Sequence, residues 1–502
     1  MSELFDKLVP HLDRMEALNA ALGLFSWDNE TLAPTAAIDN TARLMGTLSA
    51  EAYHAMINDE VKELLTALGT EAEQEKLTLK EKTIFKKLNK NYEELKKIPP
   101  AEYQAYNELM AKSGAIWAAA RENNDFASFA PVLKEIVDYQ KKFANYTKKP
   151  EMGLYDSLLN DYEEGLLSAD LDAFFDKIRT AVVPLLQKVV AQNDRIDKTY
   201  NYWQYPADKQ RKFCNFLAEY IGFDFDKGVI AESAHPFTTN LHNHDVRITN
   251  HIYENNLESA IFSVIHEGGH ALYEMGVADE LTMTPAAAIS MGMHESQSRF
   301  YENVIGRSEA FWQPLYGKLQ ELFSEQLKEI PLRQFILGIN KAAPGLIRTE
   351  ADELTYPLHI MVRYEIEKLL MDDKITVDEL PKIWNEKYQE YLGVTPSTDA
   401  EGVLQDVHWS GGMIGYFPSY AIGNAVAAQI YAFMKNEVAI DDCLSSGNLA
   451  PIREYLKNHI HQYAGTKTMN EILTELTGEP LNADYYIAYL TEKYTKLYLN
   501  EK

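Results

Sequence analysis

The chain contains 502 residues, 46% of them hydrophobic, and its 48 Lys and Arg against 75 Asp and Glu give a formal net charge of −27. The hydrophobic content is sufficient for a large buried core, and the acidic excess argues against nucleic acid and anionic membrane surfaces as partners. The two cysteines, Cys214 and Cys443, are typical of a protein in a reducing cytoplasm and are too few for a closed thiolate zinc site.

The beginning of the chain and its apolar runs predict a cytoplasmic protein without a membrane anchor. Charged residues interrupt the first apolar stretch, which therefore lacks the uninterrupted core of a secretory signal. A transmembrane helix needs a run of roughly 18 apolar residues. The best candidate, 420–434, contains Asn424 and Gln429, so we expect no membrane span.

Long amphipathic helices are predicted for most of the chain, because apolar residues recur at intervals of three and four. The ranges that show this pattern are 4–24, 40–68, 72–97, the segment that follows Pro99-Pro100 to about Arg121, and 169–192. Ser168 is expected to cap the last of these helices. Thr376 and Glu379 form a capping box before a helix that reaches Tyr391. No internal repeat or low-complexity linker divides the chain.

Strand signals are sparse, and the clearest is the short, β-branched and alternating segment from Val246 to Ile252. It lies shortly before the helical pattern that carries a histidine motif. An edge strand beside a protease cleft can pair with an extended peptide. We therefore expect a mainly α protein with a small β-sheet close to that motif, and an edge strand at this position.

Residues 266–270 read His-Glu-Gly-Gly-His within an apolar, helical pattern. Positions i and i+4 of a helix share one face, so His266 and His270 direct two imidazoles at one point, with the spacing that Zn²⁺ needs. Glu267 lies beside that face and can accept a proton from a metal-activated water. Gly268 and Gly269 are poor helix formers, which predicts that something packs close to the backbone there. The alternative is a surface helix with two hydrogen-bonded histidines, but the apolar flanks favour a buried one.

Glu295 is the predicted third metal ligand. It lies in the segment His294-Glu295-Ser296-Gln297, at the start of a second helical pattern. Two antiparallel helices bring this carboxylate opposite the histidine pair. Two His and one Glu leave a fourth tetrahedral position for water, and an open position is typical of a catalytic site.

Several sequence blocks resemble, in order, those of the carboxypeptidase Taq family of HExxH zinc metallopeptidases. They are His235-Pro236-Phe237, Asp245–Thr249 (DxRxT), the HEGGH motif, His294–Gln297 (HESQ), Ile347–Asp352 (IRxxAD) and Gly402–Trp409 (GxxQDxHW). Ser26–Thr31 also resembles a family block, although Leu32-Ala33-Pro34 departs from it. The resemblance spans nearly the whole chain, and six ordered blocks are far more specific than HExxH alone.

The resemblance implies a mainly α, long-helix, neurolysin-like peptidase fold with a deep active-site groove and a small β-sheet beside the metal. It implies a single catalytic domain over residues 1–502. It also implies one divalent metal per chain, Zn²⁺ with Co²⁺ as the alternative, a homodimer, and removal of single C-terminal amino acids from peptides.

The matching blocks also imply catalytic groups besides Glu267. His408 lies in the GxxQDxHW block, and Tyr416 and Tyr420 follow it. In related helical peptidases a His and a Tyr at similar separation act on the transition state. We therefore expect His408 and Tyr416 to stabilise the oxyanion, with Tyr420 as the second candidate. Because the chain has 30 Tyr, simple packing is the alternative role for these tyrosines.

An exopeptidase must bind a free α-carboxylate, and the planar fork of Arg suits that task. Arg348, in the IRxxAD block, is the expected anchor. Arg247, in the DxRxT block, is either a second substrate contact or a structural ion pair with Asp245. His235, in the first matching block, is a further predicted substrate contact.

Other side chains near these blocks have predicted supporting roles. Asp352 and Asp406 are expected to orient the metal-bound imidazoles. Gln297 and Arg299 are expected to brace Glu295, since Glu and Arg at i and i+4 commonly pair on a helix. His294 is either a groove-lining residue or a hydrogen-bonded core histidine.

The motif describes the chemistry and not the closed end of the substrate groove, so three functions are open. The first is a carboxypeptidase that removes single residues from peptides with a free C-terminus. The second is a metallo-oligopeptidase that cuts internal bonds or releases dipeptides. The third is a non-catalytic peptide-binding scaffold, which is disfavoured because Glu267 and all three predicted ligands are present.

Overall fold

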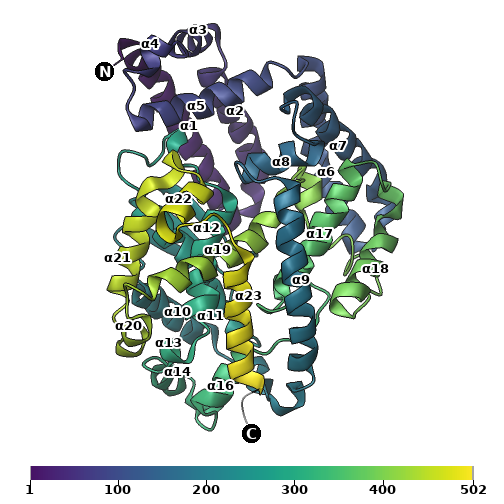
Figure 1. The fold of residues 1–502 in the computed structure, drawn as a ribbon, viewed down its shortest axis with the longest axis vertical. Helices are drawn as coiled ribbons and strands as arrows, with labels where there is room; N and C mark the ends of the chain where they lie inside the picture. The colour runs from purple at the N-terminus through teal and green to yellow at the C-terminus, as the bar shows by residue number, and fades with distance from the viewer. Residues whose placement is uncertain (1, 500–502) are drawn as a thin grey trace.

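The computed structural model describes residues 2–499, and its architecture is mainly helical (Figure 1). The N-terminal part is a series of helices, of which α3, α4 and α5 lie at the top of Figure 1 beside the start of the chain. The bounds are α1 Glu3–Thr31, α2 Ile38–Met56, α3 Asp59–Leu68, α4 Glu71–Gln74, α5 Leu79–Leu95, α6 Pro100–Glu122, α7 Phe126–Thr147, α8 Leu154–Tyr162 and α9 Ser168–Val190. The helices expected in this part of the chain are confirmed.

Local capping chemistry divides two of the expected ranges. The range 40–68 forms α2 and α3, because the side chain of Asn58 accepts a hydrogen bond from the amide of Val61 and starts a new helix. The range 72–97 forms α4 and α5, because Thr78 and Glu81 form a capping box. The predicted cap at Ser168 is wrong, since the Asp170 carboxylate accepts from the amide of Leu167 instead.

The central part of the chain contains the sheet and the helices of the histidine motif. The bounds are α10 Ala207–Ile221, β1 Gly228–Glu232, β2 Thr238–His242, β3 Asp245–Asn250, α11 Leu257–Gly276, α12 Met291–Arg299, α13 Glu309–Trp312, α14 Tyr316–Leu322, α15 Ser324–Leu327 and α16 Leu332–Ile339. A π-helical segment, Phe300–Ile305, directly continues α12.

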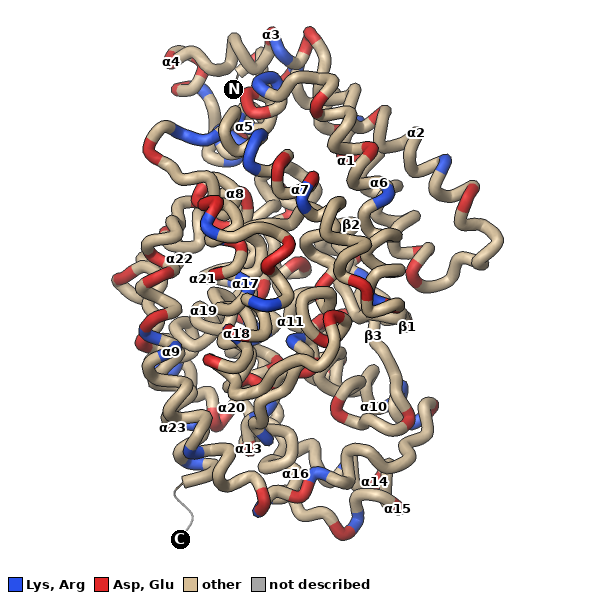
Figure 2. Tube along the Cα trace, turned by 90° about the vertical axis from the view of Figure 1, so that its right-hand side faces the viewer, with Lys and Arg blue, Asp and Glu red and all other residues tan. Residues whose placement is uncertain are grey.

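The described strands form one sheet in the order β1-β3-β2, with β1 parallel and β2 antiparallel to β3. The strand expected at 246–252 is β3, and it is the central strand, so the prediction of an edge strand there is wrong. Val246 and Ile248 of β3 are completely buried, which suits a strand with a neighbour on each side. The edge beside α11 is β2, and Figure 2 shows the three strands next to that helix.

The C-terminal part of the chain covers the other side of the motif helices. Its bounds are α17 Tyr356–Met371, α18 Leu380–Leu392, α19 Pro418–Met434, α20 Ile440–Ser446, α21 Ala450–His459, α22 Met469–Thr477 and α23 Ala483–Tyr494. The predicted capping box of Thr376 and Glu379 is confirmed at the turn that leads into α18. None of the helices in residues 2–499 is long and apolar enough to cross a membrane.

Close backbone contacts hold α11, α12 and α19 together in the middle of the fold, as the two adjacent glycines of the motif predict. A Cβ on Gly269 of α11 would lie 2.7 Å from the carbonyl oxygen of Gln297 in α12. A Cβ on Gly423 of α19 would lie 2.6 Å from Cγ of Glu295 in α12. Glycine at both positions therefore fixes the depth at which the Glu295 helix lies between its neighbours.

We expect Gly269→Ala to push α12 away from α11, because the new methyl group meets backbone atoms that cannot rotate aside. The variant should lose affinity for a divalent metal and unfold at a lower temperature than the parent. Metal titration and calorimetry measure both effects. The matched control is Gly46→Ala in α2, where a Cβ has no neighbour within 4 Å. That change should be neutral or stabilise by about 0.4–1 kcal/mol, and equal behaviour of the two variants would contradict the packing argument.

Candidate active site

The three predicted metal ligands meet at one point. His266 and His270 project from the same face of α11, and α12 brings Glu295 opposite them. Oε2 of Glu295 lies 3.9 Å from Nε2 of His266 and 3.4 Å from Nε2 of His270. The ligand atoms all lie within 4.8 Å of one another. Two imidazole nitrogens and a carboxylate oxygen at this spacing fit a single divalent ion.

The surroundings keep His270 and Glu295 in the protonation states that metal binding requires, whereas the carboxylates of Glu302 and Glu295 raise the pKa of His266 against the opposing effect of burial. Burial lowers the pKa of His270 to about 3, with a further contribution from His294 nearby, so the ring is neutral. Burial by itself raises the pKa of Glu295, but Arg299 and the neighbouring histidines outweigh it and hold that pKa well below its usual range. Nε of Arg299 donates to Oε1 of Glu295 at 2.6 Å and leaves Oε2 facing the histidines.

Glu302 orients His266, and the sequence interpretation missed it. Its Oε2 lies 2.9 Å from Nδ1 of His266, so that Nε2 of this ring faces Glu295. Arg299 and Arg307 donate to the two Glu302 oxygens at 3.1 Å each. A signal was available, because Glu302 follows Glu295 by two helical turns and i+7 positions share a face. A carboxylate in this place fixes the tautomer of a metal-ligating histidine.

Three of the predicted supporting roles are wrong. Asp352 caps the start of α17 by accepting from the amides of Leu354 and Thr355. Asp406 forms ion pairs with Arg348 and Arg363 and not with either imidazole of the motif. Gln297 does not brace Glu295, since its Oε1 lies 2.9 Å from Nε2 of His461. All three side chains accept hydrogen bonds from donors that lie away from the imidazoles of the motif. The spacing of residues in the sequence does not reveal such partners.

His294 packs directly on the metal-binding face. Its ring stacks on His270 with centroids 4.5 Å apart, and its Nε2 lies 2.8 Å from Oε1 of Glu274. Asn240 of β2 donates to the other oxygen of Glu274. His294 is therefore the hydrogen-bonded histidine that was one of its two predicted roles. Through Glu274 it connects α12 to α11 and to the sheet.

Glu267 lies beside the ligands and is buried. The hydroxyl of Thr238, on the edge strand β2, donates to its Oε2 at 2.6 Å. Burial raises its pKa, although His266 and the Thr238 hydrogen bond oppose the shift. A raised pKa makes a carboxylate a stronger base, which is the property that proton abstraction from water requires.

His408, Tyr416 and Tyr420 come together in a second group. Nε2 of His408 lies 3.0 Å from the Tyr420 hydroxyl, and its ring stacks on that of Tyr416 at 5.6 Å. Burial lowers the pKa of His408 to about 3 and raises that of Tyr416 to about 12. At neutral pH the imidazole is therefore uncharged and the phenol protonated, so both can donate a hydrogen bond to a developing oxyanion.

Arg348 lies beside this group and is almost fully buried. Its Nε donates to Oδ1 of Asp406 at 2.8 Å, and Nη1 donates to the Tyr356 hydroxyl at 3.2 Å. Its guanidinium lies 5.0 Å from the Tyr420 ring centroid. The guanidinium carbon of Arg299 lies 4.5 Å from the centroid of the Tyr356 ring. Tyr356 therefore connects Arg348 to the residues around Glu295.

Arg247 and His235 lie at the sheet. Arg247 forms two hydrogen bonds with Asp245, at 2.8 and 2.9 Å, and lies over the Trp27 ring at 5.0 Å. His235 is exposed, and its carbonyl accepts from the Ser233 hydroxyl. Within residues 2–499, no hydrogen bond or ion pair connects either residue to Glu295 or to the two histidines of the motif.

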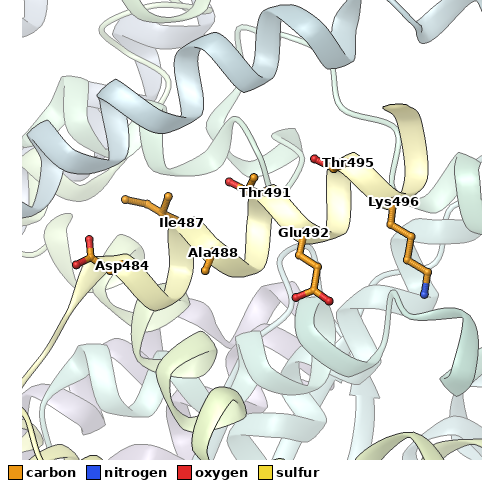
Figure 3. A pocket seen from close by; sticks show the side chains of 7 residues that line it. All are labelled: Asp484, Ile487, Ala488, Thr491, Glu492, Thr495 and Lys496. Carbon is orange, nitrogen blue, oxygen red and sulfur yellow. The ribbon is translucent and has the colours of Figure 1, made fainter. Parts of the chain in front are cut away.

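A surface cavity of about 660 Å³ lies elsewhere, along the C-terminal helix α23 (Figure 3). The side chains that line it include Ile487, Thr491 and Thr495, and it contains none of the predicted site residues. The candidate site therefore rests on the side-chain geometry of α11, α12 and α19 and not on this cavity.

Two imidazoles and a carboxylate around one point, with a buried carboxylate base alongside, define a metal-dependent hydrolase. Comparison with known proteins identifies which one. The family model described as carboxypeptidase Taq (M32) metallopeptidase matches residues 7–494. The chain belongs to this family and is a metallocarboxypeptidase, a hydrolase that acts on peptide bonds.

Similar proteins match over nearly their whole length. Carboxypeptidase 1 of Bacillus subtilis is 41% identical over 99% of this chain and 98% of its own. Thermostable carboxypeptidase 1 of Thermus thermophilus is 34% identical, with 97% of each chain covered. The crystal structure of an M32 carboxypeptidase from Deinococcus radiodurans is 31% identical, covers 99% of each chain and has a TM-score of 0.94. The expected fold class and family are thereby confirmed.

Replacement of Glu302 is expected to weaken metal binding although this residue is not a ligand. In Glu302→Gln, His266 loses its charged partner and both buried arginines lose an ion pair. Such outer groups typically contribute ten- to a hundredfold to metal affinity. Zinc titration after chelator treatment measures the change. The control is Glu329→Gln, at an exposed position beside Lys328, which should bind zinc with the affinity of the parent. If Glu302→Gln also binds zinc with the parent affinity, the carboxylate of Glu302 has no orienting role.

Proposed function

We propose that this metallocarboxypeptidase removes single C-terminal amino acids from peptides, with Glu267 as general base. The observation that carries the proposal is the meeting of His266, His270 and Glu295 beside a buried Glu267 whose pKa is raised. We further propose that residues 1–502 act as a single catalytic domain.

One divalent ion per chain is proposed as the cofactor, Zn²⁺ with Co²⁺ as the alternative. Two imidazoles and one carboxylate suit Zn²⁺ and leave an open coordination position, although donor type alone does not select one transition metal. When bound, such an ion supplies Lewis acidity, which makes water a nucleophile near neutral pH.

Different side chains are proposed to transfer the proton and to stabilise the negative charge that develops on the substrate. Glu267 accepts the proton of the attacking water and returns it to the leaving amine. The oxyanion that forms on the scissile carbonyl requires hydrogen-bond donors, and removal of one typically costs about 3–4 kcal/mol. His408 and Tyr416 are proposed for this role, with Tyr420 as the second tyrosine. Their hydrogen bond and ring contacts support a common site of action.

Arg348 is proposed to bind the α-carboxylate of the substrate. Hydrogen bonds from its Nε and Nη1 hold the guanidinium in place, and no hydrogen bond within the described part of the chain uses Nη2. A buried, pre-oriented cation gives a carboxylate a strong, charge-assisted hydrogen bond. Arg247 and His235 stay predictions as further substrate contacts, and the Asp245 pair supports the structural role of Arg247.

We also propose a cytoplasmic homodimer whose partners are peptides with a free C-terminus. Both cysteines are free thiols, which suits a reducing compartment. The net charge of −27 argues against nucleic acid and anionic membranes as partners.

Glu267→Gln tests the general base. The amide cannot accept the proton, so kcat should fall by about two to four orders of magnitude while the metal stays bound. Metal analysis and a peptide hydrolysis assay on the same preparation give both values. Activity within a few-fold of the parent would exclude Glu267 as the base.

Arg348→Ala tests the exopeptidase assignment. Loss of one partner of a buried charge pair should weaken kcat/KM for free-carboxyl peptides by roughly 2–5 kcal/mol and leave amidated peptides, already poor substrates, unchanged. Mass spectra of a digested peptide pool should show a ladder of single-residue losses in the parent. Internal fragments, or equal cleavage of amidated and free peptides, would instead assign the oligopeptidase function.

A further inference from the structure

Helix α17 presents two buried ionisable side chains to the segment that carries His408 and Tyr416, and burial raises the pKa of one of them, Glu367, to about 7. Arg363 and Glu367 lie one helical turn apart, and both are completely buried. Residues at i and i+4 share a face and often pair with each other. Here Arg363 and Glu367 do not form an ion pair with each other, and each binds residues of the segment 405–415 instead.

Arg363 holds the beginning of this segment. Its Nε donates to Oδ2 of Asp406 at 2.7 Å, and Nη2 donates to Oε1 of Gln405 at 2.8 Å. Asp406 is shared with Arg348, so the carboxylate binding two buried arginines also fixes the proposed substrate anchor. The position of His408, two residues later, follows from these contacts.

Glu367 holds the rest of the segment through both carboxylate oxygens. Its Oε1 accepts from the indole nitrogen of Trp409 at 2.8 Å, and Oε2 accepts from the amide of Gly415 at 2.9 Å. Trp409 directly follows His408, and Gly415 directly precedes Tyr416. The Tyr155 hydroxyl of α8 donates to the same Oε2 at 3.1 Å.

Close contact with α8 supports the same arrangement. Gly415 has φ of 90°, and a Cβ there would lie 2.9 Å from the backbone nitrogen of Leu159. The segment therefore packs closely on α8 and is also hydrogen-bonded to α17. Tyr162, at the end of α8, also packs edge-to-face on Tyr416 at 5.1 Å.

The energetics favour a role beyond packing. A buried carboxylate loses several kcal/mol of hydration unless hydrogen bonds replace it. Glu367 forms no ion pair with the described residues, and its hydrogen-bond donors are neutral groups of the segment and of α8. An apolar side chain could fill the same volume without that cost. It could not, however, hold the indole N–H of Trp409 and the amide N–H of Gly415 at a fixed separation.

We propose that Glu367 is a positioning residue, which sets the placement of His408 and Tyr416 relative to the metal ligands by binding Trp409 and Gly415 with one carboxylate. The proposal rests on the proposed catalytic role of these two side chains. Glu367 itself does not contact the substrate.

Glu367→Gln is the first test. The amide has the shape of the carboxylate but only one acceptor oxygen, so its NH₂ group must face a donor, either the indole N–H or the Gly415 amide. A displacement of about 1 Å in a catalytic group can lower the rate a hundredfold, so kcat should fall ten- to a hundredfold. Metal content should stay at the parent value, and KM should change far less than kcat.

A double variant separates positioning from general damage. Trp409→Phe removes the indole N–H, so that in Glu367→Gln/Trp409→Phe the amide meets no opposing donor and can still accept from Gly415. The double variant should recover part of the kcat lost in Glu367→Gln. Additive losses in kcat would contradict a shared action through the segment.

The control lies on the same helix. Glu365 binds Lys387 and Tyr391 of α18 and forms no hydrogen bond or ion pair with the segment. Glu365→Gln should therefore keep the parent kcat. Equal kcat of Glu367→Gln and Glu365→Gln would overturn the proposal. If Glu367→Gln does not fold, Tyr155→Phe replaces it: removal of this single donor should lower kcat several-fold, and an unchanged kcat would overturn the proposal.

The outcomes also distinguish this proposal from the function on which it rests. A parent enzyme without carboxypeptidase activity would reject the proposed function whatever Glu367 does. An active parent whose His408→Ala and Tyr416→Phe variants keep their kcat would reject the catalytic role of the segment. An active parent that needs both side chains but tolerates Glu367→Gln would reject only the positioning role.

Discussion

The structure depends on the burial of two carboxylates, Glu295 and Glu302, within one short stretch of chain. Two anions in a low-dielectric interior repel each other and lose hydration, so each needs a positive partner. Arg299 lies between them and binds both, and Arg307 supplies a second cation to Glu302. Since Arg299 occupies one oxygen of Glu295, the other faces the imidazoles and is free to bind a divalent cation.

Backbone contact sets the geometry at which this balance is reached. Gly269 lets the backbone of α12 approach α11, and Gly423 lets Glu295 lie against α19. The ligand side chains are short, so their meeting point follows from the separation of the helices and leaves little freedom for adjustment. The π-helical continuation of α12 then begins at Phe300 and carries Glu302 to the far side of His266. Such π-helical turns are frequently found at functional sites.

These features divide what the sequence could predict from what it could not. The pair of histidines follows from the i,i+4 rule, Glu295 follows from the helical pattern after the motif, and the family blocks led to the predicted group around His408. Thr238, which binds Glu267, comes from an edge strand that the sequence pattern did not reveal, because β3 carried the stronger signal. The roles of Asp352, Asp406 and Gln297 were missed for one reason: each binds a buried donor that is distant in sequence. Buried polar groups choose partners by three-dimensional proximity, and spacing along the chain carries little information about it.

The same reasoning explains why α17 matters although its own sequence resembles an ordinary buried helix. The proposed substrate anchor Arg348 and the segment with His408 and Tyr416 come from different parts of the chain. Asp406 and Gln405 connect both to Arg363, while Glu367 binds Trp409 and Gly415. Charged groups in a dry interior accept few alternative partners, so this arrangement has fewer low-energy conformations than an apolar contact of the same area. A rigid helix that binds both parts through buried charges can hold an irregular segment in the single geometry that hydrolysis requires.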